Sequence, residues 1–189
     1  NIPGFDGNSF KVMAKENEGY LFPDTYFFYE NVIPAQVIDA MKANFDKQIK
    51  KLQFRLTISG KSLDEAVKMA SIIEEEARDE DDRRIIAGIL WKRIEKDMPL
   101  QVDAPFFYIL GKTSAELSLN DLAMNSPYNL YKNAGLPPTP ISNPGLGAIE
   151  AALDPTETDY WFYLSDSEGV THYAETHDGH LANKVRYLQ

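Results

Sequence analysis

Cysteine is missing from the 189 residues of this chain, and so is any long apolar run. The first absence excludes disulfide bonds and metal sites with cysteine ligands, but it does not decide between a cytoplasmic and an extracytoplasmic location. A membrane-spanning helix needs roughly 20 consecutive apolar residues, and no stretch provides them. The chain begins at Asn1 without Met and shows no signal peptide, so we expect any leader or anchor to lie outside this sequence.

Positive charge is scarce. The chain carries 19 Lys and Arg residues against 29 Asp and Glu residues, a formal net charge of −10. Such a field repels a phosphate backbone unless a basic patch intervenes. The basic groups here are small, at Lys47–Lys51 and at Arg83 and Arg84, and acids lie beside both. They are typical of solvated helix faces, so we expect no nucleic-acid partner.

The remaining composition is that of an ordinary globular protein, with 43% hydrophobic and 25% charged residues. The length fits one domain or two closely packed lobes. We expect an N-terminal lobe with a connecting helix over residues 1–58, and a second domain over residues 59–189.

The spacing of apolar residues predicts an α+β fold that is rich in helices and has a small antiparallel sheet. Helices are expected from residue 34 to a break at 59–60, from 63 to about 78, from 81 or 82 to about 96, through 149–153, and from about 177 to 188. Strands are expected over 160–164 and 170–174, joined by a turn at 166–169. The first twenty residues show little periodicity and are expected to be irregular or to contain a strand.

The helix predicted from residue 63 contains an acid on its apolar face. Ser62 with Glu65 three residues later indicates a capping box at its start. At roughly 100° per residue, one stripe of the helix collects Leu63, Val67, Ala70 and Ala77. Glu74 falls inside this stripe, whereas Glu75 falls on the polar side and Glu76 at the stripe's border.

A carboxylate in apolar surroundings is costly by several kcal/mol, so it needs a purpose. Such surroundings raise its pKa, and a carboxylic acid that stays protonated near neutrality is the general acid that glycosidic-bond cleavage requires. The alternative for Glu74 is a structural role, either paired with an Arg or capping a neighbouring helix.

Six segments in order along the chain carry a family resemblance. Residues 18–26 read EGYLFPDTY, residues 70–76 read ASIIEEE and residues 98–103 read MPLQVD. Residues 126–131 read SPYNLY, followed by GLPP at 135–138 and ISNPG at 141–145. Together they resemble the motifs of the YceG-like endolytic murein transglycosylases (MltG) over most of the chain.

The resemblance implies that the domain at 59–189 cleaves peptidoglycan glycan strands in a lysozyme-like cleft, without a cofactor. The family's catalytic glutamate falls on Glu74, which the helical wheel also selects. Seven further polar residues are implied to line the cleft: Gln101, Asp103, Ser126, Tyr128, Asn129, Tyr131 and Asn143. Core packing is the alternative for Tyr128 and Tyr131, and turn formation is the alternative for Asn129.

The implied reaction breaks the β-1,4 bond between N-acetylmuramic acid and N-acetylglucosamine. Glu74 would protonate the linking oxygen and then take the proton of the muramyl C6 hydroxyl, which closes onto C1 to leave a 1,6-anhydro end. No second catalytic carboxylate is required, unlike in most glycoside hydrolases. Asp103 would gain importance if the enzyme were a hydrolase.

Two parts of the chain depart from the family motifs. Leu130 stands where the family usually has Thr, and residues 171–180 match the family's ending only loosely. We therefore assign no role to His172 or His180. The spacing of the three His residues and nearby acids matches no standard ligand pattern, so we expect no metal.

Two other functions are compatible with the sequence. One is a non-catalytic peptidoglycan-binding module that uses the same cleft. The other is a scaffold that binds cell-wall synthesis proteins through the Lys47–Lys51 helix face. The resemblance also implies an extracytoplasmic location and a membrane-anchored parent protein, with the anchor absent from this chain.

Overall fold

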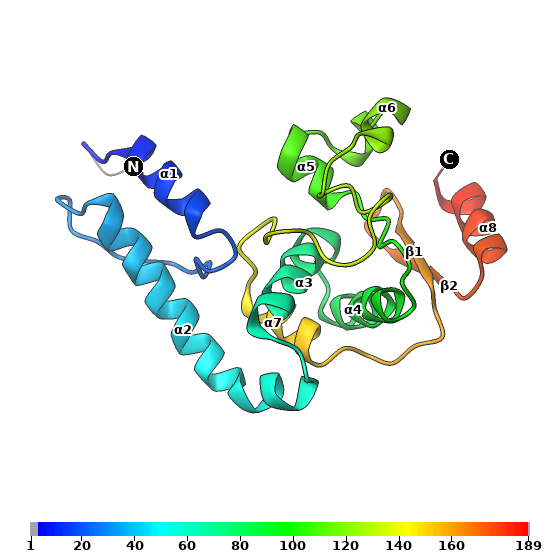
Figure 1. The fold of residues 1–189 in the computed structure, drawn as a ribbon, viewed down its shortest axis with the longest axis horizontal. Coiled ribbons are helices and arrows are strands. Elements are labelled where there is room, and N and C mark those ends of the chain that lie inside the picture. Colours follow the sequence, from blue (N-terminus) through cyan, green and yellow to red (C-terminus); the bar gives the residue numbers. More distant parts are fainter. Residues whose placement is uncertain (1–3, 189) are drawn as a thin grey trace.

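The computed structural model describes residues 4–188 as an assembly of helices with one small sheet at its side (Figure 1). The longer helices are α1 (Gly7–Glu16), α2 (Pro34–Ser59), α3 (Leu63–Glu76), α4 (Glu80–Glu95), α7 (Leu146–Leu153) and α8 (His177–Tyr187). Between α4 and α7 lie the short helices α5 (Ala104–Leu110), η1 (Ser114–Glu116) and α6 (Leu119–Ala123). The strands β1 (Phe162–Ser165) and β2 (Thr171–Ala174) form the sheet. The predicted helix-rich α+β fold is confirmed.

Helix α3 begins where the sequence predicts. The Ser62 hydroxyl accepts a 3.2 Å hydrogen bond from the Glu65 N–H, and the Glu65 carboxylate accepts one of 2.8 Å from the Ser62 N–H. The helix ends at Glu76, because Ala77 adopts an extended conformation with φ −143°. It is therefore shorter than predicted, and Glu76 is its last residue.

One apolar core holds the helices together. Figure 1 shows α3, α4 and α7 side by side at the centre of the molecule, and α3 and α4 both pack against α7. Phe45, Ile49 and Leu52 of α2 are buried in the same cluster. The expected boundary after residue 58 coincides with the turn at Gly60 between α2 and α3. Because this core spans that boundary, the division into a lobe and a domain remains a prediction.

The prediction for the first twenty residues is wrong, because residues Gly7–Glu16 form helix α1. Asp6 caps this helix, and its carboxylate accepts hydrogen bonds from the N–H groups of Asn8 and Ser9. No residue of α1 is buried, but Phe10, Met13 and Ala14 recur at helical spacing on its partly buried side, a pattern that the prediction missed. Figure 1 shows α1 beside α2, away from the sheet.

The sheet places the C-terminal helix beside the core. Strands β1 and β2 pair antiparallel, with Phe162 opposite Ala174 and Leu164 opposite His172. Helix α8 follows at once and packs against both strands. Within residues 4–188, no helix is both long enough and apolar enough to cross a membrane.

Candidate active site

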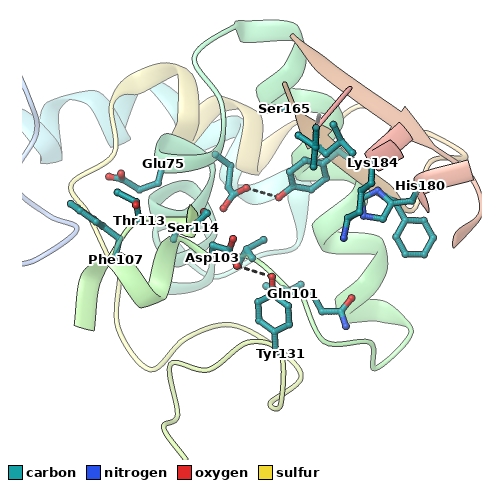
Figure 2. A pocket seen from close by; sticks show the side chains of 18 of the residues that line it. Glu75, Gln101, Asp103, Phe107, Thr113, Ser114, Tyr131, Ser165, His180 and Lys184 are labelled. Atoms are coloured by element: carbon teal, nitrogen blue, oxygen red, sulfur yellow. Dashed lines mark hydrogen bonds between the residues drawn. The ribbon is translucent and has the colours of Figure 1, made fainter. Parts of the chain in front are cut away.

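A cavity of about 810 Å³ lies between the end of α3, the start of α5, strand β1 and helix α8. This volume falls in the range of ordinary ligand pockets. Figure 2 shows Asp103 in its middle, with Thr113 and Ser114 on one side and His180 and Lys184 on the other. The cavity is therefore assembled from segments that are up to about a hundred residues apart in the sequence.

Glu76 provides a half-buried carboxyl to the cavity wall. Burial raises the pKa of Glu76 from 4.5 to about 7, and the Asp103 carboxylate adds to this rise. Hydrogen bonds from the Tyr163 hydroxyl, at 2.9 Å, and from the Ala104 N–H oppose it. The C-terminal end of a helix also disfavours an anion. A carboxyl group with a pKa near 7 can both give and take a proton at neutral pH.

Three of the predicted site residues lie together at this cavity. Asp103 accepts a 2.6 Å hydrogen bond from the Tyr131 hydroxyl, as Figure 2 shows. Gln101 has an exposed side chain at the cavity, and its φ of 53° lies in the left-handed region. This conformation is uncommon for a residue with a Cβ. A 2.9 Å hydrogen bond from the Gln101 N–H to the Leu130 carbonyl oxygen holds it in place.

Arg93 of α4 ties two walls of the cavity together. Its side chain is buried and donates a 2.6 Å hydrogen bond to the carbonyl oxygen of Leu100 and another of 2.6 Å to that of Trp161. Hydrogen bonds to a charged donor are stronger than those between neutral groups. Arg93 therefore fixes the segment before Gln101 relative to the segment before β1.

Glu74 lies elsewhere, and the apolar surroundings predicted for it are wrong. Its carboxylate is 3.5 Å from the Arg83 guanidinium and accepts a 3.2 Å hydrogen bond from the Gly145 N–H, which belongs to the N-cap residue of α7. The side chain is 28% exposed and does not line the cavity. Both structural alternatives for Glu74, pairing with an Arg and capping a neighbouring helix, are observed. Its catalytic role remains a prediction.

Comparison with known proteins assigns the chain to a family. The YceG-like family model matches residues 4–186. This chain belongs to the YceG-like family. Its relatives include endolytic murein transglycosylases from Bacillus subtilis, 38% identical over 172 residues, and Streptococcus pneumoniae, 35% identical over 177 residues.

These alignments cover 90% of this chain but only 48% and 32% of the two relatives. The YceG-like chain thus spans a third to a half of the length of these curated relatives. A solved structure of a YceG-like protein from Listeria monocytogenes has the same fold, with a TM-score of 0.82 and 36% identity. That alignment covers 94% of this chain and 64% of the Listeria chain.

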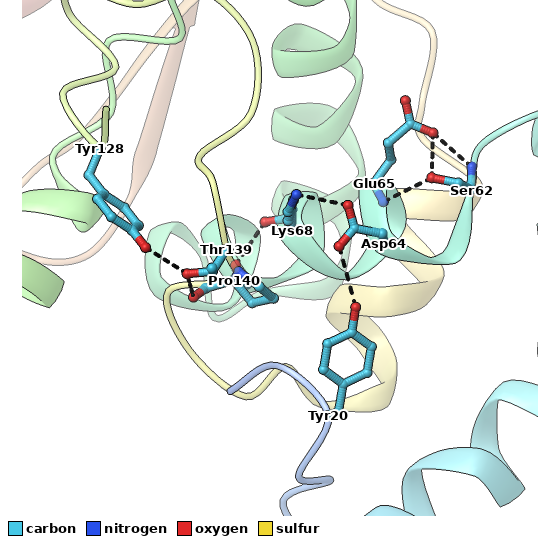
Figure 3. A network of polar contacts seen from close by, with 9 residues as sticks. Tyr20, Ser62, Asp64, Glu65, Lys68, Tyr128, Thr139 and Pro140 are labelled. Atoms are coloured by element: carbon cyan, nitrogen blue, oxygen red, sulfur yellow. Dashed lines mark hydrogen bonds and ion pairs between the residues drawn. The ribbon is translucent and has the colours of Figure 1, made fainter. Parts of the chain in front are cut away.

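Ser126, Tyr128 and Asn129 of the YceG-like chain do not line the cavity. The Asn129 side chain is fully buried, and its amide donates 2.9 Å hydrogen bonds to the carbonyl oxygens of Leu122 and Met124. The Tyr128 hydroxyl is 2.8 Å from the Thr139 hydroxyl, as Figure 3 shows. The Ser126 hydroxyl accepts a 3.2 Å hydrogen bond from the Tyr128 N–H. These contacts shape the loop, and a role in glycan binding remains a prediction for all three.

Asn143 also lies outside the cavity lining, where it joins two family motifs. Its side-chain oxygen accepts hydrogen bonds from the N–H groups of Gly19 and Leu21, at 2.9 and 3.0 Å, and its amide donates one of 2.8 Å to Glu18. Gly19 has φ +89°, and a Cβ there would lie 2.4 Å from Pro140. The motif at residues 18–26 is therefore held against the loop at 140–143, and glycan contact by Asn143 remains a prediction.

Helix α8 supplies cavity residues that the sequence did not indicate. His177, His180 and Lys184 all line the cavity, although no role was predicted for His180. His172 instead lies 2.8 Å from Asp166 and stacks on Tyr187 at 3.5 Å. His177, His180 and Lys184 are spaced three and four residues apart along α8, and this spacing places them on one face of the helix. Within residues 4–188, no group of three or more His, Cys, Asp or Glu side chains could hold a metal ion.

Proposed function

We propose that this chain is the catalytic part of an endolytic peptidoglycan lytic transglycosylase, with Glu76 as its acid and base. The observation that carries the proposal is a titratable carboxyl in the wall of a glycan-sized cavity, with its pKa raised to about 7. The family membership supports the reaction class, because the curated relatives are named endolytic murein transglycosylases.

The proposed reaction begins with protonated Glu76. Its proton passes to the oxygen that links C1 of N-acetylmuramic acid to N-acetylglucosamine, and the C1–O bond breaks as the sugar develops oxocarbenium character. The carboxylate then accepts the proton of the muramyl C6 hydroxyl, whose oxygen bonds to C1. The product is a 1,6-anhydro end, Glu76 is protonated again, and no water is consumed.

Glu76 fits this cycle better than Glu74 does. A general acid must reach the substrate and hold its proton near the working pH. Glu76 meets both conditions. The Glu74 carboxylate is engaged by Arg83 and by the Gly145 N–H, and it does not line the cavity.

The neighbouring groups have supporting roles in this proposal. Tyr163 donates to one carboxylate oxygen of Glu76, which orients the other toward the substrate. Gln101, Asp103 and Tyr131 face the same space and are proposed to hydrogen-bond the sugars. Asp103 adds negative charge near the position where positive charge develops on the sugar. We propose that the enzyme acts on the extracytoplasmic face of the cell membrane, where its substrate lies.

The reaction is tested by digesting purified peptidoglycan with this chain in water enriched in oxygen-18 and analysing the products by mass spectrometry. Anhydromuramyl ends without oxygen-18 are expected, because the C6 oxygen of the substrate closes the ring. Reducing muramyl ends that carry oxygen-18 would instead identify a hydrolase, with Asp103 as the second carboxylate. Binding to insoluble peptidoglycan without either product would favour the non-catalytic binding module.

A further inference from the structure

The wall that α8 contributes to the cavity has no part in the proposed reaction. His180 and Lys184 are four residues apart on this helix, so their side chains lie on one face, and both line the cavity. Figure 2 shows them together on the side of Asp103 opposite Thr113 and Ser114. A substrate that extends past the reacting bond in this direction would meet these two side chains.

Lys184 is a cation without a counter-ion. Its side chain is exposed, and in the part of the chain that the structure describes its ammonium group makes no ion pair. The other two cations of the cavity are engaged. Lys112 is 2.7 Å from Asp121, and the guanidinium of Arg93 donates to backbone carbonyl oxygens. Lys184 is therefore the available cation at the cavity surface.

The His180 ring forms part of the same cavity wall. Its ring stacks on Phe162, with 5.3 Å between the ring centroids. Its Nδ1 atom is buried and, among residues 4–188, has no hydrogen-bond partner. Buried polar side-chain atoms in native proteins usually have one. Because this atom is already shielded, a polar ligand in the cavity would be held by the ammonium group of Lys184, and the His180 ring forms the wall beside it.

The charge of the site indicates the kind of ligand. The chain has a net charge of −10, and Glu75, Glu76 and Asp103 all line the cavity. An uncharged stretch of glycan needs no cation, whereas an anionic group entering this cavity needs one to offset the repulsion. In peptide-bearing strands the lactyl carboxyl of muramic acid is bonded to the peptide as an amide, so the anionic carboxylates lie on the peptides.

We propose that Lys184, beside His180, binds a carboxylate of the muramyl peptide, so that the α8 wall selects peptide-bearing strands over bare glycan. This inference rests on the proposed function, because it concerns the substrate of the same cavity. Lys184 is a specificity-determining residue in this proposal and takes no part in bond cleavage.

The test uses one preparation of glycan strands in three forms: with peptides whose carboxylates are free, with the same peptides amidated, and after amidase removal of the peptides followed by amidation of the lactyl carboxyls that this exposes. The kcat/KM for anhydromuramyl release is measured on each form for the wild type, Lys184→Gln and Lys184→Arg. Arg186→Gln is the matched control, since Arg186 is an exposed cation on the same helix that does not line the cavity.

We expect Lys184→Gln to lower kcat/KM about fivefold on strands with free carboxylates and to leave the other two forms unchanged. Lys184→Arg restores the preference, and Arg186→Gln does not alter it. An equal effect of Lys184→Gln on all three forms, or no effect on any, would overturn the inference. A wild type that cleaves none of the forms would overturn the proposed function instead, so the two failures are distinguishable.

Discussion

The raised pKa of Glu76 has a consequence for folding stability that does not depend on catalysis. In the unfolded chain this carboxyl titrates near 4.5, and in the folded chain near 7. The folded state therefore holds its proton more tightly. The stability that this contributes is fully present below pH 4.5 and is lost as the pH rises through 7. Replacing Glu76 by Gln removes the titration and keeps the shape of the side chain.

The size of the effect follows from the shift. A shift of one pKa unit corresponds to roughly 1.4 kcal/mol, and Glu76 is partly titrated in the unfolded chain at pH 5 and in the folded chain at pH 8. We therefore expect the unfolding free energy of Glu76→Gln, relative to that of the wild type, to rise by about 2 to 3 kcal/mol from pH 5 to pH 8. For a chain of this length, that corresponds to a shift in relative Tm of roughly 5–10 °C. The variant becomes the more stable protein as the pH rises.

Urea unfolding of both proteins at half-unit pH intervals measures this difference directly. All other groups titrate in both proteins, so their contributions cancel. Two stability curves that stay parallel from pH 5 to pH 8 would refute the reasoning, because Glu76 would then be an ordinary solvated carboxylate.

Three further predictions concern the surroundings of the cavity. Tyr163→Phe removes a hydrogen bond that favours the ionised form of Glu76, so the falling limb of the pH–kcat/KM profile should move to higher pH. Asn143→Ala leaves the N–H groups of Gly19 and Leu21 unpaired, so we expect a loss of about 2 kcal/mol in the free energy of unfolding by calorimetry. Gly19→Ala forces a Cβ toward Pro140 at positive φ, so we expect a loss of about 1–3 kcal/mol in the same assay.

Local sequence signals predicted much of the fold. The capping box at Ser62, the turn at Gly60 and the aromatic strand before residue 165 each depend on neighbours within a few residues, and each is present in the structure. Helix α1 escaped prediction because its apolar pattern at Phe10, Met13 and Ala14 is short and lies among Gly and Asn residues, and none of its side chains is buried. Gln101, Asp103 and Tyr131, which the family motifs placed in a glycan cleft, all line the cavity, and their contact with glycan stays a prediction.

The environment of the acids on α3 could not be predicted in the same way. A helical wheel treats a helix as endless and its inner face as uniformly apolar. Arg83 and Gly145, which come from other elements, make the surroundings of Glu74 polar. The pKa of Glu76 is raised first by its burial against other segments, and the Asp103 carboxylate adds to the rise. Both facts depend on contacts between segments that are far apart in the sequence.

The central claim is that Glu76, rather than Glu74, carries the chemistry. The most direct measurement is the rate of anhydromuramyl release by Glu76→Gln and Glu74→Gln on the same peptidoglycan, with circular dichroism confirming that each variant is folded. Glutamine cannot supply the proton, so we expect Glu76→Gln to lose at least about a hundredfold in rate, while Glu74→Gln stays within about threefold of the wild type. The reverse result, with Glu74→Gln inactive and Glu76→Gln active, would contradict the account.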